Sequence, residues 1–286
     1  MLARIYDKVA QHALAQLQTP DDTKAQNCSQ QRKRKRKQQK QKQIPQDSCV
    51  FQDVIVSLPL SSALMNKADH KGQGNKNMVL QELMYPSHTS IPAQGEKKPI
   101  AYAIGLASNT KFEVAISKHY EVHGFDCTVS PSAHAVLNQP FLFHPICIGN
   151  NQQITNTVYG NSNSATPSNN SMTFVTLVDI MAKLHHEKLS LLKMDIEGAE
   201  WEVLNMMLTT FQPSQLPEQL LFELHTEHAN PIYVPPNLVQ HRGRKQVKEL
   251  FVALFAAGYR VISKEINYGD EACAEFSLLR VDGMTS

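Results

Sequence analysis

Apolar positions along this chain switch between two spacings, and the switch is clearest in residues 189–208. The segment begins as a short, nearly continuous apolar run formed by Leu189, Leu191, Leu192, Met194 and Ile196. Such a run is typical of a strand covered on both faces. Gly198 allows a tight turn, and the next apolar residues, Ala199, Val203, Met206 and Met207, recur at helical spacing. The pattern predicts a central parallel strand that turns sharply into a helix.

Strand-like and helix-like spacings of apolar residues also alternate before and after this segment. Strands are expected at Ile100–Ile104, Tyr120–Phe125, Pro140–Ile148 and Gln219–Leu224, and β-rich segments at Tyr259–Ile266 and Ala274–Val281. Helices are expected at Lys111–Lys118, Phe174–His185 and Gln246–Ala257, with Gly258 as the C-terminal cap of the last. Alternating strands and helices that end in a strand pair predict a doubly wound α/β sheet.

The regions outside this pattern are expected to be extensions and loops. Val50–Leu60 alternates partly and favours a strand, and Asn77–Met84 favours a short helix. The segments Asn150–Asn170 and His228–Arg244 are polar and are expected to form an exposed insertion and an irregular loop. We therefore divide the chain into an N-terminal extension (1–48), a lead-in segment that packs on the domain (49–98) and the main domain (99–282).

Composition fits one globular domain with extensions, because 42% of the 286 residues are hydrophobic and 19% are charged. The longest apolar runs fall far short of the roughly 20 residues of a membrane span, so no transmembrane helix is expected. Composition sets no constraint on the oligomeric state.

The net charge of +2 hides an asymmetry. The tract Arg32–Lys42 carries eight basic residues, and removing it leaves 20 basic against 26 acidic residues. The remainder therefore lacks the positive charge of a nucleic-acid-binding domain. The tract is of low complexity and is expected to be disordered. A nuclear-import signal, a polyanion-binding arm and a solvated linker all fit it.

The five cysteines are an odd number at wide spacings, which fits neither a disulfide framework nor a structural zinc site. A reducing intracellular location, cytoplasmic or nuclear, is the simpler interpretation. Asn-x-Ser sequons at Asn27 and Asn169 keep a secretory location open, and the helical spacing of residues 2–17 keeps an organellar presequence open.

Acidic residues gather where the central strand is expected to end. Asp195 and Glu197 lie at this strand end, and in open α/β sheets that edge binds ligands. Glu223 and His225 are expected at the end of the neighbouring strand. These four residues are candidates for a general base, with Asp195 as first choice and His225 as second. Glu200 is assigned only to the dipole of the following helix.

A metal is a weaker interpretation of the same residues. Glu223 and His225 lie two apart and point to one side of a strand, so with Asp195 they could hold a divalent ion. No second ligand cluster is visible in the sequence, and we expect no metal.

Three segments carry a resemblance to a known family. They are KMDIEGAEWEVL, AYAIGLASNTKFE followed about twenty residues later by VHGFD, and CAEFSLLRV near the C-terminus. Together they resemble the methyltransferase-like domains related to the FkbM-type S-adenosylmethionine-dependent methyltransferases. The resemblance covers residues 99–281, about two thirds of the chain.

The resemblance implies a Rossmann-like, seven-stranded, mostly parallel sheet with an antiparallel last strand. It also implies S-adenosylmethionine as the cofactor, lying across the carboxyl ends of the first strands. By position, Gly105 would be the glycine of the cofactor loop, with Ser108 and Asn109 as hydrogen-bonding side chains. Asp126 would bind the ribose hydroxyls, and Gly149, after the third strand, completes the expected cofactor set.

The expected activity is methyl transfer, with oxygen of a small-molecule or sugar-like acceptor favoured by the resemblance alone. The cofactor loop offers one glycine where such enzymes commonly have several. This departure supports an alternative, a catalytically inactive binding or scaffold protein of the same fold. A third possibility is a nucleic-acid modifier that uses the basic tract Arg32–Lys42.

Overall fold

A computed structural model describes residues 50–51, 54, 65–67, 77–79, 97–107, 109–149, 174–267 and 270–281. The basic tract Arg32–Lys42, the side chain of Ser108 and the insertion Asn150–Asn170 lie outside these residues. The predictions made for them, and the division into an extension, a lead-in segment and a domain, stay predictions.

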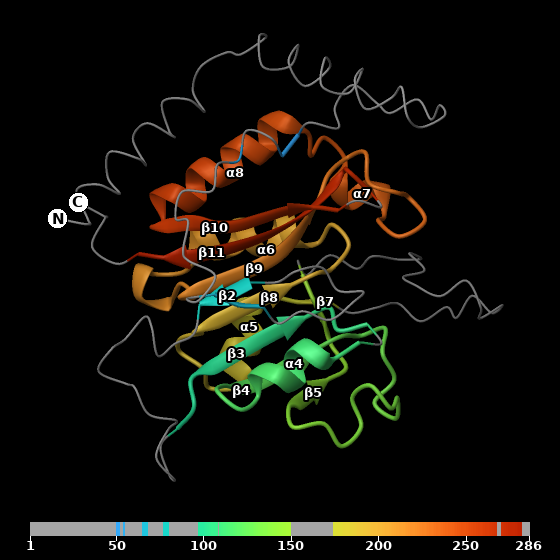
Figure 1. Cartoon of the computed structure of the whole chain (residues 1–286), viewed down its shortest axis with the longest axis vertical. Coiled ribbons are helices and arrows are strands. Elements are labelled where there is room, and N and C mark those ends of the chain that lie inside the picture. Colours follow the sequence, from blue (N-terminus) through green and yellow to red (C-terminus); the bar gives the residue numbers. More distant parts are fainter. Residues whose placement is uncertain are drawn as a thin grey trace.

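A seven-stranded sheet forms the centre of the molecule, in the order β10-β11-β9-β8-β3-β4-β5 (Figure 1). Its strands are β3 (Ile100–Ile104), β4 (Glu121–Phe125), β5 (Leu142–His144), β8 (Leu191–Met194), β9 (Gln219–His225), β10 (Tyr259–Ile266) and β11 (Cys273–Arg280). The neighbours from β5 to β9 pair in parallel, whereas the last strand, β11, is antiparallel to both β9 and β10. The predicted fold class is confirmed.

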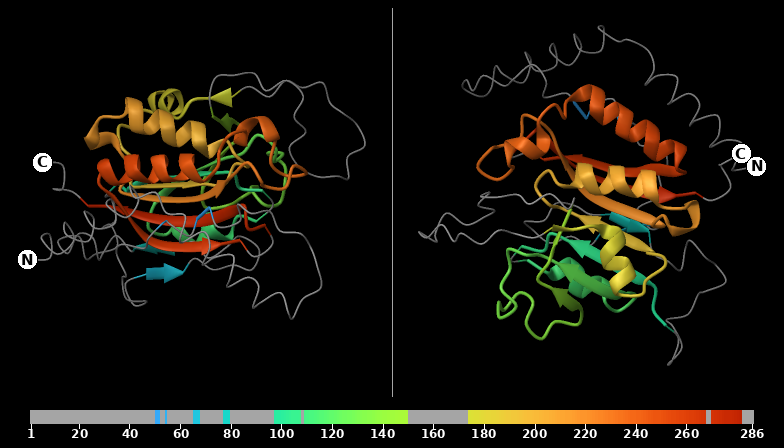
Figure 2. Two further views of the ribbon diagram at one scale, coloured as in Figure 1. Left: turned by 90° about the horizontal axis from the view of Figure 1, so that it is seen from above. Right: turned by 180° about the vertical axis from the view of Figure 1, so that it is seen from behind.

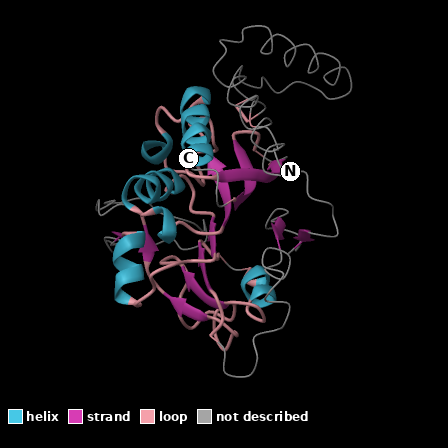
Figure 3. Cartoon of the chain, turned by 90° about the vertical axis from the view of Figure 1, so that its left-hand side faces the viewer, coloured by secondary structure: helices cyan, strands magenta, loops and turns pink. Residues whose placement is uncertain are grey.

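Helices cover the sheet unequally. They are α4 (Lys111–Ile116), α5 (Leu177–Lys183), α6 (Glu200–Thr210), α7 (Pro236–Val239) and α8 (Arg244–Ala256), with a 3-10 turn at Pro213–Gln215. Figure 3 shows one short helix, α4, on one side of the sheet and the others on the opposite side. Seen from behind in Figure 2, α5 and α6 lie over the centre of that second face. None of the helices in the described ranges has the length and apolarity to span a bilayer.

The segment 189–208 folds as its pattern predicts. Every residue of β8 is buried, and Gly198 adopts a φ of +103° that an L-residue rarely reaches. The buried apolar residues of α6 then face the sheet: Trp201, Val203, Leu204 and Met207. At the end of α8, Gly258 has a φ of +94° and follows the last helical turn as the predicted cap.

Two segments differ from the prediction near the third strand. Pro140–Ile148 is divided into β5 and β6 (Cys147–Ile148), because Pro145 between them has no N–H to continue a ladder. β6 pairs in parallel with β7 (Phe174–Val175), at residues where a helix was expected to begin. The two strands make a short ribbon that is separate from the main sheet.

The lead-in segment also differs. Asn77–Val79, expected to start a helix, forms strand β2 and pairs antiparallel with β1 (Met65–Lys67). In Val50–Leu60, the described residues Val50, Phe51 and Val54 are buried but not in a strand. Lys264 of β10 holds this part by donating to the backbone carbonyls of Phe51 and Val54.

One pair of cysteines corrects the expectation of unpaired thiols. Cys127, two residues after the end of β4, and Cys147 of β6 form a disulfide across 20 residues of sequence. Cys273, in contrast, is a buried free thiol. The bond ties the end of β4 to the β6–β7 ribbon.

Candidate functional site

A cavity of about 460 Å³ lies where β3, β4 and β8 end. This volume is within the range of about 300 to 1,000 Å³ typical of small-molecule sites. Its wall includes apolar side chains from several elements, among them Ile104, Phe125, Ile148, Phe174 and Ile196. The cavity therefore occupies the edge of the sheet where the sequence predicts a ligand.

Four carboxylates line this cavity, those of Asp126, Asp195, Glu197 and Glu223. Asp195 and Glu197 follow β8, and Glu223 belongs to the neighbouring strand β9. Glu197 has a φ of +53°, a left-handed conformation that few residues other than glycine adopt. The tight turn of Glu197 and Gly198 thus holds the Glu197 side chain at the cavity at some cost in backbone strain.

Burial and mutual repulsion shift the pKa values of two of these groups. Burial raises the pKa of Glu197 to about 7, helped by Asp195 and Glu200 and opposed by His225. Burial likewise raises the pKa of Glu223 to about 8, with Asp195 and Glu275 adding to the effect. Near neutral pH, Glu197 is thus poised to take up or release a proton and Glu223 is mostly protonated.

His225 lies beneath the cavity and is outside its lining. Its Nδ1 bonds Glu200 Oε1, and its Nε2 lies 3.3 Å from Glu197 Oε2. Burial opposes a charge on this imidazole, but the contacts with Glu200 and Cys273 together raise the pKa of His225 well above its usual value. The structure thus places His225 against Glu197, where it orients that carboxylate, and a direct catalytic role for His225 stays a prediction.

The same residues also have the spacing of metal ligands. The donor atoms of Asp195, Glu197 and His225 lie within 4.8 Å of one another. Both ring nitrogens of His225 contact carboxylates of the protein, Nδ1 that of Glu200 and Nε2 that of Glu197. The expectation that no metal binds here stays a prediction.

Glu200 does more than complement a helix dipole, which corrects the sequence interpretation. It is fully buried, and its Oε2 accepts a 2.7 Å hydrogen bond from the Gly198 N–H while Oε1 holds His225. Glu200 thereby fixes both the turn that presents Glu197 and the histidine behind it. A glutamate within the apolar face of a helix is the sequence signal that could have indicated this role.

Gly105 is required by packing within the protein, and its contact with a cofactor stays a prediction. Its φ is +79°, and a Cβ at this position would lie 1.8 Å from the Asp195 backbone oxygen. The glycine thus permits close approach of the loop after β3 to the end of β8. Asn109, from the same loop, lines the cavity, and its hydrogen bond to a cofactor stays a prediction.

Lys193 supports this loop from below and was missed by the sequence analysis. Its side chain is 1% exposed within β8, and Nζ donates a 2.7 Å hydrogen bond to the Gly105 carbonyl. Nζ also lies 3.3 Å from Glu113 Oε1 of α4, a carboxylate that is fully buried. Lys193 thus joins the loop after β3, strand β8 and helix α4.

The carboxylate of Asp126, directly after β4, binds the same loop through one oxygen and Thr128 through the other. Oδ2 accepts hydrogen bonds from the N–H groups of Leu106 at 2.9 Å and Ala107 at 3.0 Å. Oδ1 accepts from the Thr128 N–H at 2.8 Å and its hydroxyl at 2.6 Å. All four acceptor positions of a carboxylate are thus used within the protein. Asp126 lines the cavity, and its contact with a ribose stays a prediction.

Gly149 is not brought to the cavity. Its N–H donates to the Val175 carbonyl at 3.0 Å, and a Cβ there would meet the Phe174 ring at 2.7 Å. The residue therefore belongs to the packing of the β6–β7 ribbon. Cys127 and Cys147, which no prediction included, do line the cavity, so the disulfide is part of its wall.

Comparison with known proteins gives a family match over the described domain. Residues 98–261 match the model described as the methyltransferase FkbM domain. Probable methyltransferase-like protein 24 is 32% identical over 126 residues in Homo sapiens and 32% identical over 130 residues in Rattus norvegicus. Each match covers 43% of this chain and 32% of the relative, so the chain spans about a third of the length of these curated relatives.

Solved structures show weaker likeness. An rRNA methylase from Streptococcus thermophilus has a TM-score of 0.35 and 8% identity, covering 72% of this chain and 100% of that chain. The N-methyltransferase NodS from Bradyrhizobium japonicum has a TM-score of 0.32 and 8% identity, covering 71% and 97%. Neither likeness bears on the substrate of this chain.

Proposed function

Because this chain belongs to the methyltransferase FkbM domain family, we propose that it transfers a methyl group from S-adenosylmethionine to an oxygen of a small-molecule or sugar-like acceptor. The observation that carries the proposal is the set of carboxylates, Asp195, Glu197 and Glu223, at the cavity where strands of a family-type sheet end. Such an edge binds ligands in open α/β sheets.

The residues around the cavity suit this cofactor. S-adenosylmethionine supplies a methyl group on a positively charged sulfur. Carboxylates that face the cavity favour a cation there, and the apolar wall gives the adenine ring a surface on which to pack. The loop after β3 is held by Asp126 and Lys193 and closes one side.

Glu197 is the best-placed general base for a hydroxyl acceptor. It lines the cavity and carries a pKa of about 7, which is suited to taking a proton near neutral pH. Asp195, the first choice from the sequence, lines the same cavity and raises the pKa of both neighbours. Glu223, mostly protonated, can donate a hydrogen bond to the acceptor oxygen.

Cofactor binding is the experiment that tests the proposal. We expect S-adenosylmethionine and S-adenosylhomocysteine to bind one to one in calorimetry and to raise the melting temperature, since a ligand that binds only the native state stabilises it. ATP, which shares the adenosine but lacks the sulfur, serves as the control. No binding of either cofactor form would favour the inactive scaffold, which the single glycine of the loop also supports.

Asp126→Ala is expected to weaken S-adenosylmethionine binding about 10-fold to 100-fold. The substitution removes two hydrogen bonds that hold the loop after β3 and two from Thr128, together with any bond to the ribose. Thr128→Val is the matched control, because it removes one hydroxyl donor to Asp126 and leaves the carboxylate in place. Isothermal titration calorimetry gives both affinities, and equal affinity in Asp126→Ala and the parent protein would contradict the assignment.

A further inference from the structure

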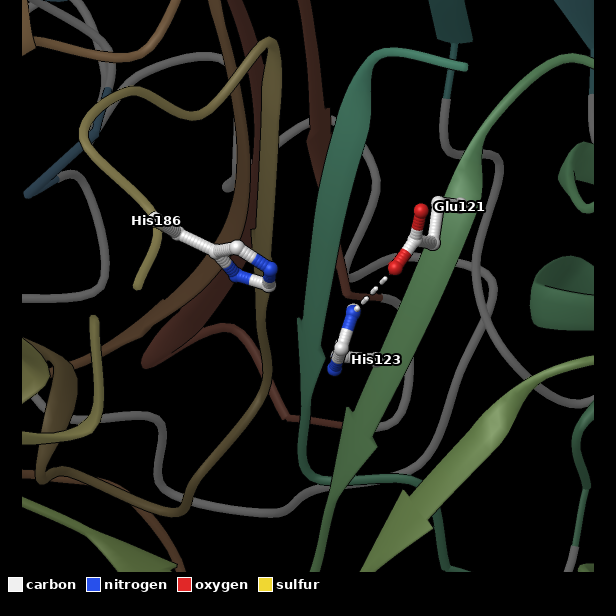
Figure 4. A group of neighbouring side chains, drawn as sticks. All are labelled: Glu121, His123 and His186. Atoms are coloured by element: carbon white, nitrogen blue, oxygen red, sulfur yellow. Dashed lines mark hydrogen bonds and ion pairs between the residues drawn. The ribbon is translucent and has the colours of Figure 1, made fainter. Parts of the chain in front are cut away.

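A second cluster of ligand-type side chains lies on the helix-covered face of the sheet, outside the lining of the cavity. Glu121 and His123 lie two apart on β4, and His186 follows α5 (Figure 4). His144 of β5 and Tyr102 of β3 pack against these rings. None of these five residues has a part in the proposed methyl transfer.

The first three residues converge at distances that suit a metal. Glu121, His123 and His186 each offer a ligand atom, and these atoms all lie within 4.8 Å of one another. In Figure 4 the His186 ring points toward Glu121 and His123. Glu121 Oε1 and His123 Nε2 are 3.3 Å apart, which matches the edge of about 3.3 Å of a tetrahedron with zinc bonds of about 2.0 to 2.1 Å.

The other ring nitrogen of each histidine has a partner of its own. His123 Nδ1 lies 3.0 Å from His144 Nε2, and His186 Nδ1 lies 2.8 Å from the Tyr102 hydroxyl. Histidines that bind metals commonly donate their second N–H to such an outer partner, which fixes the tautomer and the ring orientation. His144 and Tyr102 can accept these protons, leaving both Nε2 atoms to a metal.

The cluster is open to solvent on one side. The His123 side chain is only 4% exposed, whereas the Glu121 side chain is 46% exposed and supplies a carboxylate on the open side. An ion could therefore enter from solvent and bind the two imidazoles behind the carboxylate.

We propose that Glu121, His123 and His186 form a binding site for a divalent transition-metal ion of the zinc type, with water in the fourth position. Two imidazoles and one carboxylate are ligands that zinc accepts, whereas Mg²⁺ prefers an octahedral set of oxygens. The ion would join β4 to the turn after α5.

Zinc titration of the full chain, freed of metal by a chelator, tests the site. One Zn²⁺ per chain is expected, with Mg²⁺ unable to compete. Glu121→Gln and His186→Gln are each expected to weaken zinc binding at least about 10-fold. His185→Asn is the matched control: it changes the neighbouring exposed histidine and keeps a residue that tolerates its φ of +58°.

Two further readouts separate this site from others. Glu197→Gln, at the cavity, should leave the zinc affinity unchanged, and Co²⁺ should give the visible absorption of a tetrahedral site that Glu121→Gln abolishes. Because the Glu121 side chain is half exposed, this variant should fold normally. Absence of stoichiometric zinc binding, or equal zinc affinity in Glu121→Gln, His186→Gln and the parent, would overturn the proposal.

Discussion

Glu197→Gln is expected to lower kcat for methyl transfer to a hydroxyl acceptor about 10²- to 10⁴-fold, the usual contribution of a general base. Glutamine keeps the size of the side chain, and its amide oxygen can accept a hydrogen bond from His225, but it cannot take a proton. Cofactor affinity should change little, since the substitution leaves the Gly105 loop and Asp126 intact. Single-turnover rates with S-adenosylmethionine separate the chemical step from binding.

The pH profile gives this prediction a second readout. A base must be deprotonated to act, so kcat/KM should rise with pH through about 7, the pKa of Glu197. It should fall again as Glu223 loses its proton near pH 8. In Glu197→Gln the rising limb should disappear. Glu249→Gln, on the exposed side of α8, is the control, and a Glu197→Gln enzyme with full activity and an unchanged profile would contradict the role.

Lys193→Met is expected to lower the free energy of unfolding by about 3 to 5 kcal/mol, because it leaves a buried carboxylate without its counter-charge. The Glu113 oxygens have no hydrogen-bond partner among the described residues, and Lys193 is the cation beside them. The variant also removes the donor to the Gly105 carbonyl, so the cofactor loop should loosen. Urea unfolding and cofactor titration measure the two effects.

The matched control removes both charges. In Lys193→Met/Glu113→Leu no charge is left unpaired, and replacing a buried ion pair by apolar residues is often close to neutral for stability. We expect this double variant to recover most of the lost stability, whereas its cofactor affinity should stay low. A double variant as unstable as Lys193→Met would show that the ion pair is not the cause.

The parts of the fold that depend on local pattern could be predicted from the sequence. The apolar run of β3 gave its bounds directly, and the run before Asp195 placed β8 because a central parallel strand is apolar on both faces. Pairing between distant short segments could not be predicted. β6 pairs with β7, which lies on the other side of the insertion in the sequence, and β2 pairs with β1. The local spacing of apolar residues does not indicate either pairing.

The candidate site divides in the same way. Asp195, Glu197 and Glu223 could be placed together because adjacent parallel strands end at one edge of a sheet. The role of Lys193 could not be predicted, since its partners Gly105 and Glu113 lie 88 and 80 positions away in the chain. The disulfide was missed because the wide spacing of the cysteines says nothing about which strand ends meet.

The hydrogen bonds from Asp126 to the loop after β3 affect the entropic cost of binding a ligand. A loop that depends on several glycines is flexible and must be ordered when a ligand arrives. Here the backbone of Leu106 and Ala107 is already fixed by a side chain from the next strand. Binding to a preorganised wall has a smaller entropic cost, so the single glycine of this loop is compatible with tight binding.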